Sequence, residues 1–255
     1  MPIYDSKSEA AKTLKGLNLY HFSFSNCSQR VRLALAEKGL SWKSHHLDLT
    51  KNEHITEEYQ AINPKGVVPT LVNDGEVVIE SNDIILYLEE KFPTPALIPD
   101  NAAQRSVMEA HIHLCGKSQG AVKVYTYDKL FRQFIKLSDD DFGFLENNRA
   151  NQDVIQFMDD YRNDGEIWTM RVETAVKDIA SFLERLNKSL SKYTWLSGDN
   201  FGLADISWVV NFHRLNTTGY PTEEYPELCK WFERITARQS FSDAVLNYQS
   251  DIEFT

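Results

Sequence analysis

The feature that most constrains the fold is a change of pattern near residue 100. Up to residue 92, runs of β-branched and aromatic residues alternate with runs whose apolar residues recur every three or four positions. The first pattern predicts strands and the second predicts helices. After a proline-rich stretch at 93–103, only helical patterns follow. The sequence therefore predicts an α/β domain followed by an all-α domain.

In the first part, the Asp74-Gly75 pair between VVPTLV and EVVIE is typical of a β-hairpin. With the elements before it, the hairpin gives the order βαβ-α-ββα, a parallel crossover followed by an antiparallel pair. The other expected elements are strands at 17–24 and 42–49 and helices at 25–39, 54–62 and 81–92. Gly39 is expected to cap the first of these helices.

Beyond residue 103 the expected helices lie at about 104–127, 166–191, 205–216, 226–238 and 241–249. Residues 128–165 form a polar, acidic insertion, a composition typical of a solvated segment. Its aromatic residues predict that parts of it pack on the second domain; they are Phe131, Phe134, Phe142, Phe144, Phe157 and Tyr161. The expected domains are therefore 17–95 and 104–255, preceded by a flexible leader at 1–16.

Composition excludes several classes of function. The 255 residues include 27 Lys and Arg against 37 Asp and Glu, a net charge of −10, which disfavours binding to nucleic acid or to an anionic membrane. No apolar run approaches the roughly 18 residues that a membrane span needs. Three scattered cysteines do not make a disulfide scaffold, so we expect a cytoplasmic protein.

Ser25 stands where the first strand passes into a helix. The free N–H groups and the positive end of the helix dipole favour an anion or a thiolate there, although an N-cap role alone would also account for a serine. In the turn Ser25-Asn26-Cys27-Ser28, the first and fourth positions are serine. A two-cysteine redox cycle is thereby excluded. Cys27 fits either a reactive thiol in the first helical turn or the buried apolar face.

Two further constellations flank the predicted hairpin. If the Val68-Pro69 bond is cis, the Val68 peptide groups turn outward, where an extended peptide can bond to them; an ordinary trans proline is the alternative. Glu80-Ser81 begins a helix, where a serine can bind a carboxylate and the glutamate an ammonium. That pair fits the head group of an α-amino acid, and equally a capped helix with a surface glutamate.

The sequence predicts no metal site. His45 and His46 point to opposite faces of a strand, and His111 and His113 diverge on a helix. Neither a glycine-rich phosphate loop nor a Gly-x-Ser-x-Gly elbow is present.

Taken together, the motifs resemble those of the cytosolic glutathione transferases over residues 17–245. The resemblance is carried by YHFSFSNCSQRVRLALAEKGL, INPKGVVPTL, DGEVVIESNDIILYLEEKFP, FGLADISW and WFERITARQSF. It implies a thioredoxin-like N-terminal domain of the βαβ-α-ββα type and an all-helical C-terminal domain. It also implies a homodimer that binds glutathione on the first domain and a small hydrophobic electrophile between the two.

The resemblance assigns roles to individual residues. Ser25 falls on the catalytic position of the serine-type members, and Cys27 on the third position of the SxC pattern of the zeta class. Lys51 and His54 match the KxxH arrangement of theta-like members, which reaches the glycine carboxylate of glutathione. The resemblance also implies that Val68 bonds to the cysteinyl backbone of glutathione, and that Glu80 and Ser81 bind its γ-glutamyl group.

Further residues are assigned by position alone. Arg30 and Lys65 are outer candidates for binding the anionic tripeptide, and His111 and Cys115 are expected near the substrate pocket. The function implied is attack of an activated glutathione thiolate on an electrophile. A non-catalytic glutathione-binding scaffold and a Cys27-based thiol transferase are the alternatives.

The sequence also departs from the family pattern. The helix-capping box of the second domain begins with Gly202 where Ser or Thr is usual, which predicts a modest loss of stability. Gln239 replaces a usual proline. The insertion, with its LSDDDF run, resembles that of bacterial β-aryl etherases, which makes aromatic ethers candidate substrates.

Overall fold

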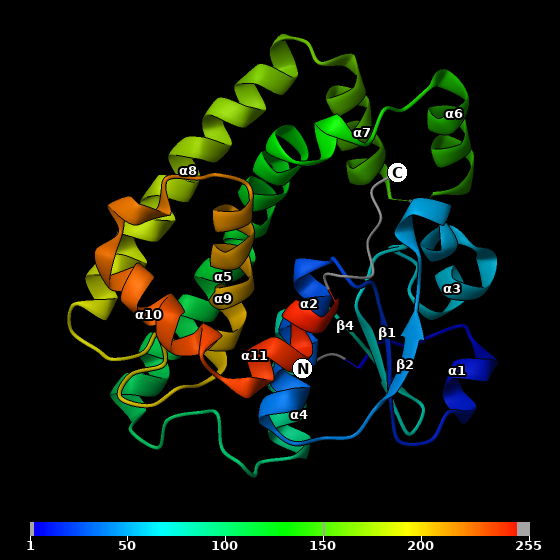
Figure 1. Ribbon diagram of the computed structural model, residues 1–255. Helices are drawn as coiled ribbons and strands as arrows, with labels where there is room; N and C mark the ends of the chain where they lie inside the picture. Colours follow the sequence, from blue (N-terminus) through cyan, green and yellow to red (C-terminus); the bar gives the residue numbers. More distant parts are fainter. Residues whose placement is uncertain (1–2, 150, 249–255) are drawn as a thin grey trace.

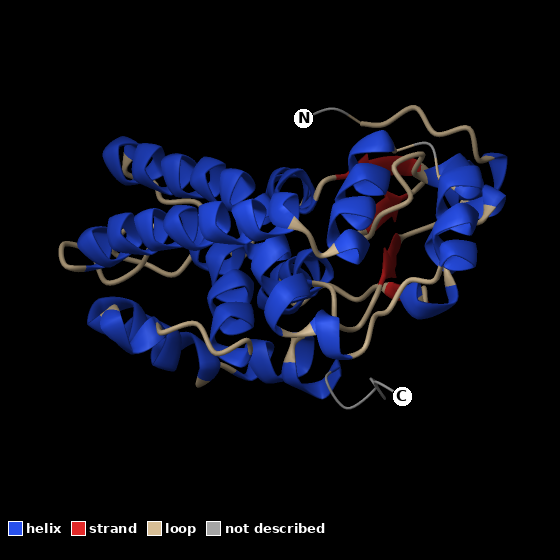
Figure 2. Cartoon of the chain, turned by 90° about the horizontal axis from the view of Figure 1, so that it is seen from above, coloured by secondary structure: helices blue, strands red, loops and turns tan. Residues whose placement is uncertain are grey.

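The computed structural model describes residues 3–149 and 151–248. A small sheet with flanking helices lies beside a larger group of helices (Figure 1). Seen from above, the long helices extend away from the sheet to one side (Figure 2). The predicted α/β plus all-α architecture is confirmed.

The sheet has four strands in the order β2-β1-β3-β4. β1 and β2 are parallel, whereas β3 is antiparallel to both β1 and β4. The strands are β1 (Leu17–His21), β2 (Lys43–His46), β3 (Thr70–Asn73) and β4 (Glu76–Ile79). Asp74 and Gly75 join the last two with φ of 47° and 88°, the backbone that a two-residue hairpin turn requires, so the predicted hairpin is confirmed.

Helices cover both faces of the sheet. Leu71 and Val78 face α2 and α4, while Val72 and Val77 belong to a second apolar cluster on the opposite face, under α1 and α3. These helices are α1 (Glu9–Thr13), α2 (Asn26–Glu37), α3 (Glu57–Ile62) and α4 (Ser81–Lys91). The predicted glycine cap is confirmed, because Gly39 has φ of 61° and the N–H of Leu40 bonds to the carbonyl of Leu35.

Two predicted strands are too long. The first ends at His21, because the next residues form the turn into α2, and the second covers only Lys43–His46. The helix predicted at 54–62 is divided into a 3-10 turn, η2 (Glu53–Ile55), and α3, since the Thr56 hydroxyl caps a new helix by accepting from the N–H of Tyr59. A second 3-10 turn, η1 (Leu49–Lys51), precedes η2.

The leader prediction needs correction for residues 3–16. Tyr4 forms a bridge with Val77, and the buried hydroxyl of Ser6 donates to the carbonyl of Ala61. Ala11 is fully buried in the apolar cluster under α1. The segment therefore packs on the sheet, and its polar sequence conceals this because only a few small side chains make the contacts.

The helical part is built around α5, which packs against both α8 and α9. Its helices are α5 (Ala102–Lys129), α6 (Asp139–Asn148), α7 (Gln152–Asn163), α8 (Glu166–Leu190), α9 (Leu203–Thr217), α10 (Pro226–Thr236) and α11 (Gln239–Ala244). Short 3-10 turns complete it: η3 (Phe131–Gln133), η4 (Thr222–Glu224) and η5 (Leu246–Tyr248). The last predicted helix is shorter than expected, and residue 249 lies outside the described ranges.

The insertion is folded. Phe157 and Tyr161 of α7 contact Trp168 of α8 edge to face, with ring centroids 5.5 and 5.1 Å away. This confirms that part of the segment packs on the helical domain. Its other helix, α6, lies over η1, η2 and α3 of the first domain (Figure 1), where the carbonyl of Asn148 accepts from the Gln60 side chain at 2.9 Å. The insertion thus contacts both domains.

The structure gives a reason for Gly202 at the start of α9, where cap preferences alone predict a modest loss of stability. A Cβ on Gly202 would lie 2.4 Å from the carbonyl oxygen of Leu97, so only glycine fits without a shift. The missing cap is supplied by Ser197, whose hydroxyl accepts from the N–H of Ala204 at 3.1 Å. Asp205 completes the turn, because its carboxylate accepts from the N–H of Gly202. Glycine is therefore a packing requirement here, compensated by another serine.

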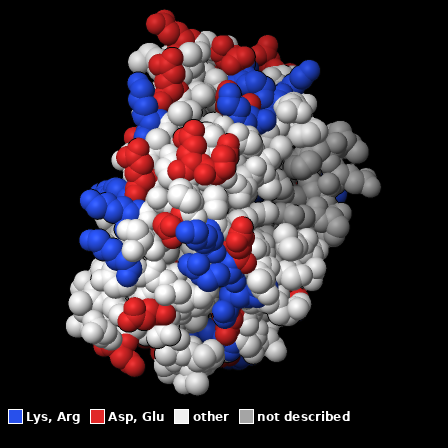
Figure 3. Space-filling view, turned by 60° about the vertical axis from the view of Figure 1, so that its left-hand side comes forward, with Lys and Arg blue, Asp and Glu red and all other residues white. Residues whose placement is uncertain are grey.

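None of the helices in the described ranges is long and apolar enough to cross a membrane. On the face shown in Figure 3, acidic and basic side chains are interspersed.

Candidate functional site

The candidate residues of the first domain gather at one edge of the sheet. Tyr20 pairs with Thr70, and Thr70 pairs with Ile79, so the end of β1, the start of β3 and the end of β4 share this edge. Ser25 follows β1, Val68 precedes β3, and Glu80 and Ser81 follow β4. The fold therefore brings together chain segments that are more than 40 residues apart in the sequence.

Ser25 caps α2. Its hydroxyl oxygen accepts from the N–H of Ser28 at 3.3 Å, and it is partly exposed. A hydroxyl has one donor and two acceptor positions, so this bond leaves its proton free to donate. The N-cap role and an anion-binding role are thus compatible at this position.

Cys27 lies in the first turn of the same helix and is partly buried. Its sulfur contacts the side-chain oxygen of Gln119 at 3.6 Å and Nη1 of Arg30 at 3.7 Å. Burial lowers the pKa of the nearby Arg214, and the interaction with Cys27 opposes that change. Cys27 therefore faces the helical domain across the domain interface.

Arg30 is not an outer ligand, and that prediction is wrong. Its side chain is fully buried and donates to Oγ of Ser81 at 2.6 Å and to the carbonyl of Ser207 at 3.0 Å. It also contacts Asn211 and Cys115. Arg30 connects α2, α4 and the helical domain, and it fixes the Ser81 hydroxyl.

Glu80 and Ser81 lie at the start of α4, as predicted. Glu80 has φ of 66°, an uncommon backbone for a residue other than glycine. Its carboxylate pairs with Lys65 at 2.5 Å, and both side chains are half exposed. Lys65 is therefore engaged with Glu80 rather than standing apart as a separate cation.

Val68-Pro69 is a cis peptide, as hypothesised. The loop before it is held by Tyr59, whose hydroxyl donates to the carbonyl of Val67 at 2.7 Å. The side chain of Asn63 donates to the same carbonyl at 2.9 Å. Val68 is thereby fixed at the edge of the sheet beside Glu80 and Ser81.

Lys51 and His54 occupy different environments. Lys51 is 73% exposed and pairs with Asp48 at 3.1 Å. His54 is buried, and its Nε2 accepts from the guanidinium of Arg149, at the end of α6. Burial, followed by the charge of Arg149, lowers the pKa of His54 from 6.5 to about 4, so the imidazole is neutral at pH 7.

The pocket assignments of His111 and Cys115 need correction. Both are buried where α5 packs on α9. Nδ1 of His111 bonds to the carbonyl of Leu196 at 2.8 Å, and the thiol of Cys115 donates to the carbonyl of Ser207 at 3.2 Å. Neither side chain lines either of the two hollows that border the insertion.

Three aromatic rings, of Phe24, Phe131 and Tyr127, extend from the residue before Ser25 into the helical domain, and we call them the aromatic wall. The ring of Phe24 lies 5.8 Å from that of Phe131, which lies 5.0 Å from that of Tyr127. The buried guanidinium of Arg214 covers Phe24 at 3.7 Å and donates to its carbonyl. These rings form a continuous aromatic cluster that connects the residue before Ser25 with α5 and η3 of the helical domain.

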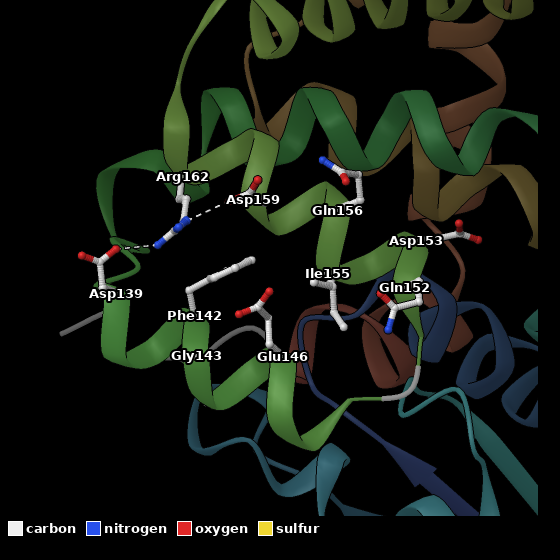
Figure 4. Close-up of a pocket in the computed structure, with 10 residues that line it drawn as sticks. All are labelled: Asp139, Phe142, Gly143, Glu146, Gln152, Asp153, Ile155, Gln156, Asp159 and Arg162. Atoms are coloured by element: carbon white, nitrogen blue, oxygen red, sulfur yellow. Dashed lines mark hydrogen bonds and ion pairs between the residues drawn. The ribbon is translucent and has the colours of Figure 1, made fainter.

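Two hollows border the insertion. One, of about 680 Å³, lies between α6 and α7, where Arg162 lies between Asp139 and Asp159 (Figure 4). The other, of about 420 Å³, lies between α6 and the η1–α3 segment and is lined by Lys51, Phe144 and several polar residues. In the described ranges, no group of three or more His, Cys, Asp or Glu residues is placed to hold a metal ion.

Sequence reasoning missed Arg149 and Arg214. Arg214 lies in the regular apolar pattern of α9, and Arg149 follows an acidic, polar run, so neither position carries a local signal. Their contacts join residues 190 and 95 positions apart.

The comparisons with known proteins agree with this geometry. The family model of the glutathione S-transferase N-terminal domain matches residues 19–96, and that of the C-terminal domain matches 153–239. Over 238 residues, the chain is 32% identical to glutathione S-transferase Z1 of Arabidopsis thaliana, a match that covers 92% of this chain and 94% of that protein. The chain therefore belongs to the glutathione S-transferase family, and it is a glutathione transferase with glutathione as co-substrate.

Two further relatives refine this placement. The chain is 27% identical to maleylacetoacetate isomerase of Pseudomonas aeruginosa, over 89% of this chain and 95% of that protein. The crystal structure of beta-etherase LigF from Sphingobium sp. strain SYK-6 matches with a TM-score of 0.82 and 27% identity, over 89% of this chain and 98% of that chain.

Proposed function

We propose that this transferase ionises the thiol of glutathione at Ser25 and directs it at a small aromatic electrophile. The observation that carries the proposal is the geometry of Ser25, an N-cap whose hydroxyl proton is free while its oxygen is fixed by Ser28. Glutathione would lie along the sheet edge, with Val68, Glu80 and Ser81 on its cysteinyl and γ-glutamyl parts and Lys51 and His54 near its glycine.

The energies are sufficient for this role. A free thiol has a pKa of about 8.5, and lowering it by about two units requires about 2.7 kcal/mol. One hydrogen bond to a charged group contributes about 1.5–3 kcal/mol, and a helix N-terminus adds about 0.3–1 kcal/mol. The Ser25 hydroxyl and the first turn of α2 supply one of each.

A β-aryl ether is the electrophile we favour. In this reaction the thiolate attacks the carbon that bears the aryloxy group, a C–S bond forms, the C–O bond breaks, and the aryloxide leaves and takes up a proton. The similarity to beta-etherase LigF supports this choice. The aromatic wall of Phe24, Phe131 and Tyr127 beside Ser25 supports it as well.

The test compares Ser25→Ala with Ser25→Thr, which keeps a hydroxyl. We expect Ser25→Ala to raise the pKa of the bound thiol by about one to two units. We also expect it to lower turnover by at least tenfold, with little change in glutathione affinity and with Thr retaining most activity. The thiolate absorbance of the complex is titrated, and a β-aryl ether, an aryl halide and a maleylacetoacetate-like acid are assayed. Identical titration curves for the Ala variant and the parent would refute the role of Ser25.

The same measurements separate the alternatives. A glutathione adduct on Cys27 in the intact mass would favour a thiol transferase. Glutathione binding without turnover of any electrophile would favour a scaffold. The homodimer, the cytoplasmic location and the domain limits 17–95 and 104–255 remain proposals, and light scattering tests the first.

A further inference from the structure

The end of the insertion places a buried positive charge at the domain interface, with no acidic partner among the residues that the structure describes. Arg149 is 8% exposed and bonds to His54, which is itself 8% exposed. Nε of Arg149 and Nδ1 of His54 are both buried without a hydrogen-bond partner. Within residues 3–149 and 151–248, no carboxylate pairs with Arg149.

A second cation lies behind it. Nζ of Lys123, on α5, lies 3.6 Å from the ring of Phe157 and 5.8 Å from that of Tyr127. Burial and then the charge of Arg149 lower the pKa of Lys123 from 10.5 to about 8. Like charges therefore act on each other in a partly dehydrated space, next to the aromatic wall that begins at Phe24.

Such an arrangement is unfavourable in the free protein. Buried charges are normally paired, because desolvation without compensation costs several kcal/mol. The other buried arginines of the described chain bond to backbone carbonyls, as Arg30 does with Ser207. A neutral imidazole is a weak partner for a guanidinium, whereas a carboxylate accepts two of its N–H groups at once.

We propose that Arg149, supported by Lys123, binds a carboxylate of a ligand in the interdomain site. The proposal rests on the glutathione transferase function. The carboxylate belongs either to the glycine of glutathione, which would approach from the side of His54, or to the electrophile, which would approach from the side of Tyr127. The stretch 97–152 that contains Arg149 lies between the two family matches. The insertion thus contributes a binding residue to a site built otherwise from the sheet edge and α5.

The experiment uses Arg149→Met, which removes the charge and keeps an apolar side chain, in the full chain. Lys123→Met is a second variant. Arg162→Met is the matched control, because Arg162 belongs to the same insertion but is paired with Asp139 and Asp159. Melting temperatures verify folding, and Arg149→Met is expected to melt no lower than the parent, since it removes an unpaired buried charge.

Two arms distinguish the source of the carboxylate. In the first, calorimetry compares glutathione with its glycine monoethyl ester. If the glycine carboxylate is bound, Arg149→Met weakens glutathione binding about tenfold to a hundredfold, and the ester binds parent and variant alike. In the second, 4-chloro-3-nitrobenzoate is compared with its methyl ester. If Arg149 binds the carboxylate of the electrophile, the parent has a higher kcat/KM for the acid than for the methyl ester, by a similar factor. The Arg149→Met variant then loses that preference.

An effect in either arm supports the proposal, provided that Arg162→Met shows none. Unchanged affinity and unchanged acid preference in both Arg149→Met and Lys123→Met overturn it. That result would leave the proposed function standing if the bound thiol still titrates with the pKa expected for the parent, so the two failures are distinguishable.

Discussion

Gly202→Ser tests whether the preference for serine as an N-cap or the close packing around Gly202 determines stability at the start of α9. Ser is a better N-cap residue than Gly by a few tenths of a kcal/mol, so the sequence alone predicts a slight gain in stability. The structure predicts the opposite sign. A Cβ at this position would lie 2.4 Å from the Leu97 carbonyl oxygen and 2.9 Å from both Cβ and Oγ of Ser197.

The magnitude follows from the contacts that must move. Overpacking costs about 1–3 kcal/mol. Displacing Leu97 weakens its bond to the N–H of Leu203, worth about 1 kcal/mol. Moving Ser197 weakens the cap on Ala204, worth about 1 kcal/mol. Gly202→Ser should therefore lower the free energy of unfolding by about 3–5 kcal/mol, or the melting temperature by roughly 10 °C.

Urea unfolding followed by tryptophan fluorescence measures this loss. Gly120→Ala is the control, because Gly120 lies in α5 with no atom within 4 Å of the position that a Cβ would take, and it should gain about 1 kcal/mol. Ser197→Ala should lose about 0.5–2 kcal/mol through the cap alone. A Gly202→Ser variant as stable as the parent would refute the steric conflict with Leu97 and Ser197. N-cap preference alone would then account for this position.

Two further perturbations test the interior. Burial and then the charge of Arg32 lower the pKa of His21 from 6.5 to about 3, so only the unfolded state takes up its proton between pH 6.5 and pH 3. Stability should then fall as the pH decreases, by about 2 kcal/mol at pH 5, and His21→Gln should flatten the dependence of the urea midpoint on pH. Glu37, on α2, accepts from Nε and Nη2 of Arg238 at 2.7 Å each, and its side chain is 8% exposed. Glu37→Gln should cost about 1–3 kcal/mol in urea unfolding, and an unchanged midpoint would show that this fork does not hold the domains together.

The elements of the first domain could be predicted because their signals are local. The Asp74-Gly75 turn, the Gly39 cap and the Ser81 helix start each depend on neighbouring residues, and all three are confirmed. The packing of residues 3–16 could not be predicted. A helix of five residues is marginal alone, and Ser6 and Ala11 are ordered by contacts with segments about 50 or more residues away.

The residues of the candidate site also fall into those that local sequence signals predict and those that depend on distant contacts. Ser25, Val68 and Ser81 stand at element ends, so strand order and register bring them together once the topology is known. The role of Arg30 could not be predicted, because an arginine on an amphipathic helix resembles a surface residue. The partners that bury it, from Ser81 to Asn211, lie 51 to 181 positions away, and no local sequence pattern predicts those contacts.

Charge explains why an acidic chain can still hold an anionic tripeptide. The net charge of −10 opposes binding, but exposed charges are screened over about 8 Å at physiological salt. Lys51, at 73% exposure, is subject to that screening and shares its charge with Asp48. Arg149 is withdrawn from the solvent, and among the residues that the structure describes it is hydrogen-bonded to a neutral imidazole and paired with no carboxylate. A carboxylate beside Arg149 would therefore experience a positive charge that is screened far less than that of Lys51, so the proposed contact with Arg149 would offset the repulsion by the distant acidic surface.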